Sequence, residues 1–198
     1  MKASSKNPQR EAIAKAKKAL EAGLLVIIPT DTVYGLAAHP AVAGAIEKIY
    51  EAKQRERSKP VPMLVSGMEI AVARGAQFGR AAKALAARFW PGPLTLVVPV
   101  AGGFEGFRVP AHPVAQALLE AVGGALYATS ANVSGQRPAS SAEEAARLLA
   151  PFVAAVIDGS PRPLGIASTV VKIKDEIVAV LREGAVPRAD IESCAHFM

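Results

Sequence analysis

The chain has 198 residues, of which 51% are hydrophobic and 5% aromatic, and its formal net charge at pH 7 is +6. A chain of this length can bury one generous core without disulfide bonds, and its single cysteine excludes a disulfide framework and a site built from several thiolates. The positive charge favours an anionic partner, and charged residues interrupt every apolar run well before it reaches membrane-spanning length. We therefore expect a soluble, cytoplasmic protein that does not interact with a membrane.

Helical patterns open the chain and recur between its apolar runs. Asn7 is expected to cap the first helix, Pro8 suits its first turn, and Gly23 ends it. Ser141, with Glu144 three residues later, forms a capping box for another helix. In chain order, the predicted helices cover 8–22, a segment that starts near 40, 69–89 with a break near 75–79, 113–122 and 141–150.

Short apolar runs between these helices predict strands, because each run is too brief for a helix. The predicted strands are 24–28, 63–65, 94–100, 107–109, 125–129, 153–157, 168–173 and 177–182. The last two flank Lys174, Asp175 and Glu176, which favours a hairpin. Strands outnumber what a strict βαβ alternation requires. We therefore expect an α/β (α+β) fold in one domain, with a twisted mixed β-sheet flanked by helices.

Polar residues gather just beyond several strand ends, where open α/β sheets hold ligands. These segments are 29–36, 53–59, 129–135 and 160–169. The chain contains neither G-x-x-x-x-G-K-[ST] nor a G-x-G-x-x-G that follows a strand, so a nucleotide site here would be neither a P-loop nor a Rossmann site. The histidines lack metal-ligand spacing, and no Ser-His-Asp order or carboxylate pair indicates hydrolysis.

The run KQRERSK at 53–59 contains four cations, Lys53, Arg55, Arg57 and Lys59, and one acid, Glu56. One interpretation is a solvated helix end whose cations complement the helix dipole. The other is a fixed cationic cluster that holds a polyphosphate such as ATP. Prolines at positions 60 and 62 favour the second, because they tie the run to the strand that follows.

Two arginines stand out at strand ends. Arg108 has apolar neighbours and no dominant acidic residue nearby in the chain, so it is either a surface residue or an inward cation that meets a ligand carboxylate or phosphate. Arg182 has Glu183 beside it in the sequence, so an ion pair between the two is a simpler interpretation of Arg182 than a ligand contact. Thr32, in the turn after the first strand, and Ser168, at the start of a later one, are by themselves typical of turns and strand ends.

Taken together, these segments resemble the motifs of the YrdC family. They occur in its order: PTDTVYGL, the KQR of EAKQRERSKP, WPGPLTLVV, RVPAHP, TSANVSG, STVV and LREG. The resemblance runs from about residue 12 to about residue 188 and is to the short form of the family, with a single YrdC-like domain over residues 1–198. It implies a sheet like that of dihydroxybutanone-phosphate synthase, with helices around a concave basic surface.

The resemblance also implies a function, that of a threonylcarbamoyl-AMP synthase, which is a nucleotidyltransferase. Such an enzyme converts L-threonine, bicarbonate or CO2, and ATP into threonylcarbamoyl-AMP and pyrophosphate. A partner transferase then passes the threonylcarbamoyl group to adenosine 37 of tRNAs that read codons starting with A. ATP would enter with Mg²⁺ held mainly by its phosphates, and no tightly bound cofactor is implied. Fixed cations would supply much of the catalysis, because two anions must react.

Residue roles carry over by motif. The resemblance assigns L-threonine to Thr32, Arg108 and Ser168. It assigns catalysis at the ATP phosphates to Lys53 and Arg55. The remaining ATP contacts fall to Lys59, Ser130, Asn132 and Arg182.

Two other interpretations stay open. One is a carbamoyl-adenylate-forming module like the YrdC-like domain of hydrogenase-maturation carbamoyltransferases, which lies within a much larger chain. The other is an RNA-binding or ribosome-maturation protein that uses its positive charge to bind tRNA or other RNA weakly. The chain lacks the aromatic residues interleaved with basic ones that single-stranded RNA recognition favours.

Overall fold

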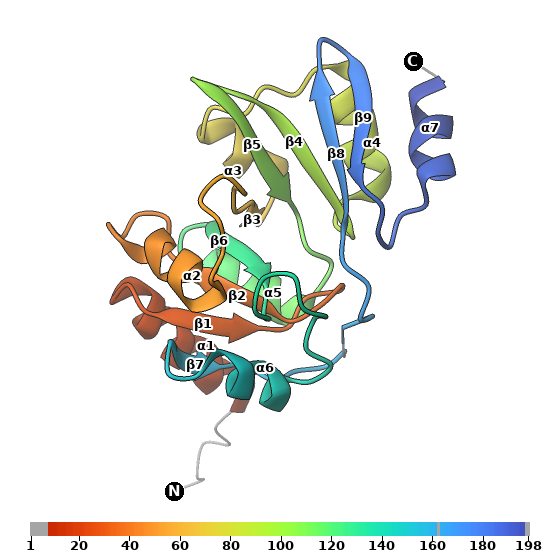
Figure 1. The fold of residues 1–198 in the computed structure, drawn as a ribbon. Helices are drawn as coiled ribbons and strands as arrows, with labels where there is room; N and C mark the ends of the chain where they lie inside the picture. The colour runs from red at the N-terminus through yellow and green to blue at the C-terminus, as the bar shows by residue number, and fades with distance from the viewer. Residues whose placement is uncertain (1–7, 162, 197–198) are drawn as a thin grey trace, which may run out of the picture.

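The computed structural model describes residues 8–161 and 163–196 (Figure 1). Its strands are β1 (Leu25–Ile28), β2 (Gly35–Ala38), β3 (Met63–Val65), β4 (Leu94–Val100), β5 (Gly103–Arg108), β6 (Ala125–Ser130), β7 (Val153–Val156), β8 (Thr169–Lys174) and β9 (Ile177–Arg182). Its helices are α1 (Pro8–Glu21), α2 (Ala45–Lys53), α3 (Met68–Ala73), α4 (Arg80–Phe89), α5 (Pro113–Ala121), α6 (Ala142–Leu149) and α7 (Arg188–His196). None of these helices is long and apolar enough to cross a membrane.

The strands form one sheet in the order β7-β1-β2-β6-β3-β5-β4-β8-β9. Three neighbouring pairs are parallel, namely β1 with β7, β3 with β5 and β4 with β8. The other five pairs are antiparallel, and β8 with β9 is the predicted hairpin. The prediction of a mixed sheet flanked by helices is therefore confirmed.

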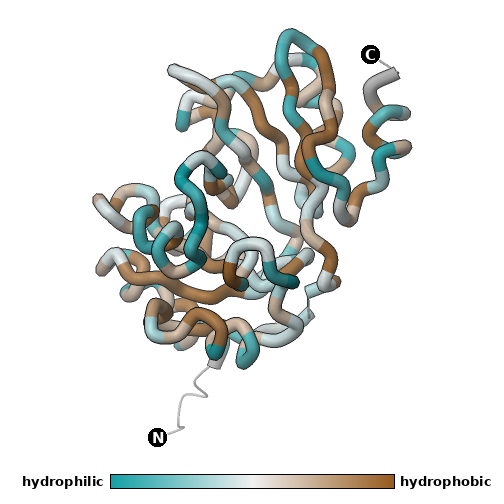
Figure 2. The backbone as a smooth tube through the Cα atoms, in the orientation of Figure 1, coloured by the Kyte–Doolittle hydropathy of each residue, from teal (hydrophilic) through white to brown (hydrophobic). Residues whose placement is uncertain are grey.

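Strand β1 is buried on both faces, because its alternate side chains enter two different cores. Val26 and Ile28 pack with residues of α1 and α5. Leu25 and Ile27 pack with residues of α2 and α6. A strand covered by helices on both faces needs a continuous apolar run rather than an alternating one, and Figure 2 shows this stretch as hydrophobic.

The half of the sheet that contains β4, β5, β8 and β9 is different, because helices cover only one of its faces. Leu94, Leu96 and Val98 of β4 enter a core shared with α3, α4 and α7. Successive side chains of a strand point to opposite faces, so Thr95 and Val97 point away from this core. They line a cavity instead. The uncovered face of the sheet is thus one wall of the candidate site.

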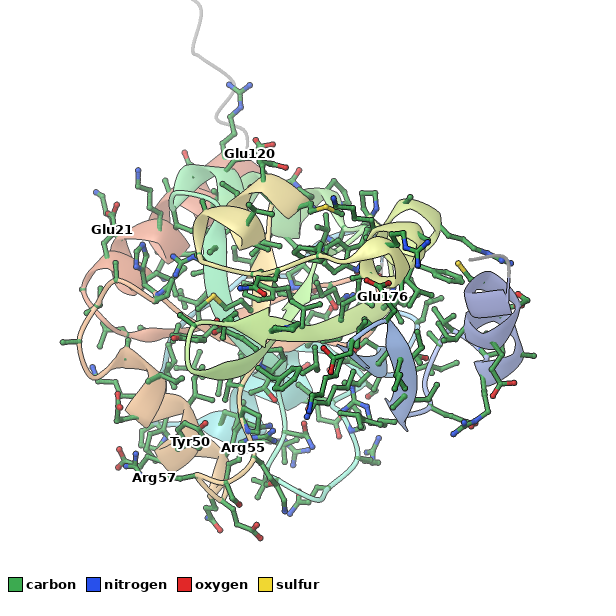
Figure 3. The ribbon with its side chains drawn as sticks, turned by 90° about the horizontal axis from the view of Figure 1, so that it is seen from above. Glu21, Tyr50, Arg55, Arg57, Glu120 and Glu176 are labelled. Atoms are coloured by element: carbon green, nitrogen blue, oxygen red, sulfur yellow. The ribbon has the colours of Figure 1, made fainter. Side chains whose placement is uncertain are left out.

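The turn between β8 and β9 caps a distant helix. The Glu176 side chain accepts hydrogen bonds from the main-chain N–H groups of Arg80 (3.1 Å) and Ala81 (2.7 Å) at the start of α4 (Glu176 is labelled in Figure 3). A carboxylate at this position satisfies two helix N–H groups that have no partner within the helix. Gly79 permits the approach, because a Cβ atom there would lie 2.1 Å from Glu176 Oε1.

Most predicted elements are confirmed with nearly the predicted bounds, and four differ. The helix predicted from about residue 40 begins at Ala45, after Gly44 in a left-handed conformation (φ 75°). The strand predicted at 107–109 is β5, which starts earlier. Strand β2 and helix α7 were not predicted. The sequence of β2, GLAA, has no β-branched residue, and this strand forms because β1 and β6 pair with it on both sides.

Candidate active site

A cavity of about 320 Å³ lies against the uncovered face of the sheet. Its walls come from the turn after β1, the segment after α2, and strands β2 to β6, β8 and β9. Three arginines line it, Arg55, Arg108 and Arg182. Hydroxyl groups and apolar side chains complete it, among them Thr95, Phe104, Val170 and Leu181. A cavity with several fixed cations and hydroxyl donors has the chemistry of an anion-binding site.

The predicted site residues divide into two groups. Six of them line the cavity, although they come from segments far apart in the chain: Thr32, Arg55, Arg108, Ser130, Ser168 and Arg182. The other three, Lys53, Lys59 and Asn132, do not line it. Thr95 and Phe104 line the cavity and were not predicted. The signal for Thr95 was its polar side chain at an alternating position in the apolar run LTLVVPV.

Arg108 is an inward cation, with 6% of its surface exposed. Its guanidinium donates to Gly92 O (3.0 Å), to Thr32 Oγ1 (2.7 Å) and to a carboxylate oxygen of Asp31, with which it forms an ion pair. Burial lowers the pKa of Arg108, and the charge of Asp31 offsets part of that effect. The acidic partner of Arg108 is therefore not a neighbour in the chain but stands 77 positions earlier.

The hydroxyl groups beside Arg108 form a directed chain. Thr30 Oγ1 donates to Val33 O (2.6 Å), so in its 3.0 Å contact with Thr32 Oγ1 it must accept. Thr32 therefore spends its single proton on Thr30 and accepts from Arg108. The lone pair that remains on Thr32 can only accept a hydrogen bond, so this hydroxyl suits an N–H or O–H group of a ligand.

Arg182 and Ser168 form a second polar corner. Arg182 donates to the Ser168 carbonyl through Nε (3.2 Å) and Nη2 (2.8 Å), and Nη2 also reaches Ser168 Oγ (3.2 Å). Thr95 Oγ1 lies 2.9 Å from Ser168 Oγ. One of these two hydroxyl protons is used between them, which leaves the other for a ligand. Burial, and then the charge of Arg55, lowers the pKa of Arg182, which reflects two cations that share one cavity.

Lys53 lies inside the protein, with 1% of its surface exposed. Its ammonium donates to the main-chain carbonyls of Ser130 and Asn132, both at 2.5 Å, and lies 3.4 Å from Asn132 Oδ1. The main chain returns the contact, because Ser134 N donates to Lys53 O at 3.0 Å. Burial, and then the charge of Arg55, lowers the pKa of Lys53 to about 8. Lys53 thus fastens the loop after β6 to the end of α2.

Asn132 shapes that loop from within. Only 4% of its surface is exposed, and its Nδ2 donates to Val133 O (2.9 Å) and Gln136 O (2.6 Å). Gly135, with φ 83°, makes the turn between them. The hydroxyl of Ser130, by contrast, has no hydrogen-bond partner among the described residues and lines the cavity. Asn132 and Gly135 therefore shape the loop, and Ser130 presents its hydroxyl to the cavity.

The segment after α2 carries the exposed cations. Arg55 donates to Lys59 O (2.9 Å) and Pro60 O (3.0 Å), so the chain curls around its guanidinium, and the side chain also reaches the cavity. Lys59 forms an exposed ion pair with Glu56 (3.2 Å), and the Arg57 guanidinium lies 5.8 Å from the centre of the Tyr50 ring. Figure 3 shows Arg55, Arg57 and Tyr50 together on one side of the molecule. Of this run, only Arg55 lines the cavity.

This chain is similar in sequence and in structure to known proteins. The family model of Sua5, YciO and YrdC, described as "Telomere recombination", matches residues 18–184. The chain belongs to the Sua5/YciO/YrdC family. The threonylcarbamoyl-AMP synthase of Bacillus subtilis (strain 168) is 36% identical over 201 residues, which cover 96% of this chain and 57% of that protein. A putative threonylcarbamoyl-AMP synthase of Mycobacterium tuberculosis H37Rv is 38% identical over 184 residues, which cover 88% of this chain and 84% of that protein.

A solved structure of the same family is also similar. Sua5 of Pyrococcus abyssi, crystallised in complex with L-threonine, superposes with a TM-score of 0.87 and 32% identity, over 94% of this chain and 57% of that one. The present Sua5/YciO/YrdC chain therefore spans little more than half of two of the proteins that it matches. The predicted YrdC resemblance and its fold are confirmed.

Proposed function

We propose that this chain synthesises threonylcarbamoyl-AMP from L-threonine, bicarbonate or CO2, and Mg·ATP, with release of pyrophosphate. The observation that carries the proposal is the convergence of Arg55, Arg108 and Arg182 on one cavity together with hydroxyl donors. The synthase names of the B. subtilis and M. tuberculosis relatives, and the L-threonine bound to P. abyssi Sua5, support it.

The chemistry explains why cations matter more than a nucleophile. The threonine amine attacks CO2, an N–C bond forms, and the amine loses a proton to give a carbamate. A carbamate oxygen then attacks the α-phosphorus of ATP, and the bond to pyrophosphate breaks. Each cation about 4 Å from one phosphate charge contributes roughly 4 kcal/mol of attraction at an effective dielectric constant near 20, before desolvation. Since about 1.36 kcal/mol of barrier is tenfold in rate, a few well-placed arginines account for a large acceleration.

The contacts suggest a division of roles. Arg108 uses three of its five N–H groups on protein oxygens, and the two left over would bind the threonine carboxylate. Thr32 would accept from the substrate N–H or O–H, and the Thr95–Ser168 pair would donate. Arg55, Arg182 and the free hydroxyl of Ser130 would bind the phosphates.

Three predicted ATP contacts take supporting roles in this proposal. Lys53 and Asn132 hold the loop that presents Ser130, and act on ATP through it. Lys59, exposed and paired with Glu56, contributes only to the field at the rim of the cavity. In the described residues no group of three or more His, Cys, Asp or Glu side chains is placed to hold a metal ion, so we propose that Mg²⁺ enters on the phosphates of ATP.

The product indicates what must consume it. Threonylcarbamoyl-AMP is a mixed anhydride, and such a compound donates its acyl group to a nucleophile. We propose that a cytoplasmic transferase receives it and modifies adenosine 37 of tRNAs that read codons starting with A.

Pyrophosphate release tests the function. Purified protein with ATP, Mg²⁺ and bicarbonate is expected to release pyrophosphate only when L-threonine is added. Release with carbamoyl phosphate in place of threonine and bicarbonate would point to the carbamoyl-adenylate reaction instead. No turnover, together with tight tRNA binding at physiological salt, would favour an RNA-binding protein.

A further inference from the structure

We propose that Asp31 is a positioning residue for the substrate carboxylate: it fixes the orientation of the Arg108 guanidinium and acts through hydrogen-bond geometry rather than through its charge. This inference rests on the proposed function, because it concerns the side of the cavity assigned to threonine. Asp31 was not among the predicted site residues and does not line the cavity. It stands behind Arg108, in the turn after β1.

The guanidinium of Arg108 is held rigidly by the protein. Arg108 is fixed from three sides, by Gly92 O, Thr32 Oγ1 and Asp31 Oδ1. Asp31 Oδ1 also accepts from Ala111 N (3.1 Å), so a single oxygen joins the end of β5 to the segment that follows it. Without the Asp31 side chain, Arg108 Nη2 loses its acceptor, and only Gly92 O and Thr32 Oγ1 still fix the orientation of the guanidinium.

The turn that carries Asp31 is itself held by hydrogen bonds to another segment. Leu164 N donates to Asp31 O (3.3 Å), and Gly165 N donates to Thr32 O (2.8 Å). The main chain of Asp31 is therefore fixed by the loop that precedes β8, independently of its carboxylate. Because its backbone is fixed, the Asp31 carboxylate can hold the Arg108 guanidinium in place. On a loose turn, the carboxylate would instead move with the guanidinium.

The two carboxylate oxygens of Asp31 have different surroundings. Asp31 Oδ2 is buried and has no hydrogen-bond partner among the described residues. One oxygen therefore makes both of the carboxylate's hydrogen bonds. An asparagine amide has one such oxygen, so it can reproduce both contacts while it removes the negative charge. Its amide nitrogen would take the place of Oδ2, which has no partner among the described residues, so D31N is expected to lose some stability. An alanine removes both the contacts and the charge.

These two substitutions provide the test. Both lose the charge, so any difference between Asp31→Asn and Asp31→Ala reports the contacts. We expect the threonine KM of D31N to stay within about threefold of that of the unmodified protein, and D31A to raise it at least tenfold relative to D31N, with the KM for ATP equal in the two variants within about twofold. The surface variant E21Q, in which an exposed carboxylate paired with Lys17 is neutralised in the same way, is the matched control and should behave as the unmodified protein.

Several outcomes would overturn the inference. Equal threonine KM values for D31N and D31A would remove the role of the contacts: values raised equally above that of the unmodified protein would assign the effect to charge, and values equal to it would show that Asp31 has no part in threonine binding. Parallel losses for threonine and ATP in D31A would mean that the residue serves only stability. If D31A does not fold, D31S replaces it, because a serine hydroxyl is too short to reach Arg108 as the carboxylate does.

A structural readout keeps this inference separate from the proposed function. Crystal structures of D31N and D31A should show Arg108 in its present position in the first and displaced in the second. Inactivity of the unmodified protein would count against the function and leave this comparison intact. An unmoved Arg108 in D31A would overturn the positioning role whatever the substrate is.

Discussion

The Lys53 ammonium donates a hydrogen bond to the main-chain carbonyl of Asn132 at 2.5 Å, inside the protein and not in the cavity. A second bond to Ser130 O and the return bond from Ser134 N make this a two-way connection between α2 and the loop after β6. The cation at the start of the basic run thus differs from those that follow it. It organises the loop, while Arg55 lines the cavity.

Replacement of Lys53 by Met should weaken ATP turnover and stability together. Methionine matches the length of the stem but leaves the Asn132 carbonyl without its Lys53 donor, while the Ser130 carbonyl keeps only the bond from Asn132 N. A buried carbonyl without a donor costs about 1–3 kcal/mol. We expect the free energy of unfolding to fall by about that amount in urea titrations, and kcat/KM for ATP to fall with it. Full activity in a destabilised K53M protein would contradict the idea that Lys53 holds a functional loop.

Activity and stability should respond to alkaline pH in opposite directions. The pKa of Lys53 is lowered from 10.5 to about 8 in the folded protein. Between these values the unfolded chain binds the extra proton, so this group makes the free energy of unfolding rise with pH, by at most about 1.4 kcal/mol per pH unit. The neutral Lys53 amine has one N–H donor fewer and no charge, so it holds the loop after β6 less firmly. Activity should therefore fall near pH 8.

The contribution of Lys53 to the pH dependence of stability is obtained by subtracting the curve of K53M from that of the unmodified protein. Stability curves from pH 7 to 10 are compared for the unmodified protein and K53M, which share every other titrating group. The slope difference should be small at pH 7 and should grow as the pH rises past about 8, where the folded protein has lost the Lys53 proton and the unfolded chain still holds it. Identical slopes for the two proteins would show that Lys53 does not titrate in this range.

Arg55→Ala should reduce kcat for ATP by about 100-fold or more, as expected when a donor to a developing charge is removed. Its hydrogen bonds to Lys59 O and Pro60 O are exposed, so the melting temperature should hardly change. Arg57→Ala is the matched control, since Arg57 belongs to the same run but does not line the cavity. A similar loss in both variants would indicate that the run acts as a diffuse basic patch.

Much of the fold follows from local sequence, and the partners in the site do not. The strands β1 and β4 are apolar runs with clear ends, and Ser141 caps α6 as its spacing predicts, with Ser141 Oγ accepting from Glu144 N at 3.0 Å. Arg108 is recognisable as an unusual cation, but its partner Asp31 lies in a turn brought near by the sheet order. Pairings across such separations depend on topology.

Lys53 illustrates the same limit for burial. In the sequence it is one of four cations in a seven-residue run, and nothing in that run distinguishes the cation that is buried from those that stay exposed. It is buried because it is the last residue of α2, where the helix passes beneath the loop after β6. The predicted concave basic surface stays a prediction.

Glu176→Ala should lower stability without any effect on activity. The carboxylate caps the first turn of α4, and loss of a cap costs about 1 kcal/mol. Gly79→Ala should have a similar effect, because its Cβ would displace the same carboxylate. Both variants are measured by urea unfolding and by pyrophosphate release. A large loss of activity would mean that α4 is coupled to the cavity, although the two lie on opposite faces of the sheet.

The most direct test of the account is the identity of the nucleotide product. The protein is incubated with ATP, Mg²⁺, L-threonine and ¹³C-bicarbonate, and the products are resolved by mass spectrometry. The account predicts an adduct that contains both threonine and AMP and carries one ¹³C atom, formed in step with pyrophosphate. An unlabelled threonyl-AMP, in which the amino acid carboxylate and not a carbamate has attacked ATP, would contradict it.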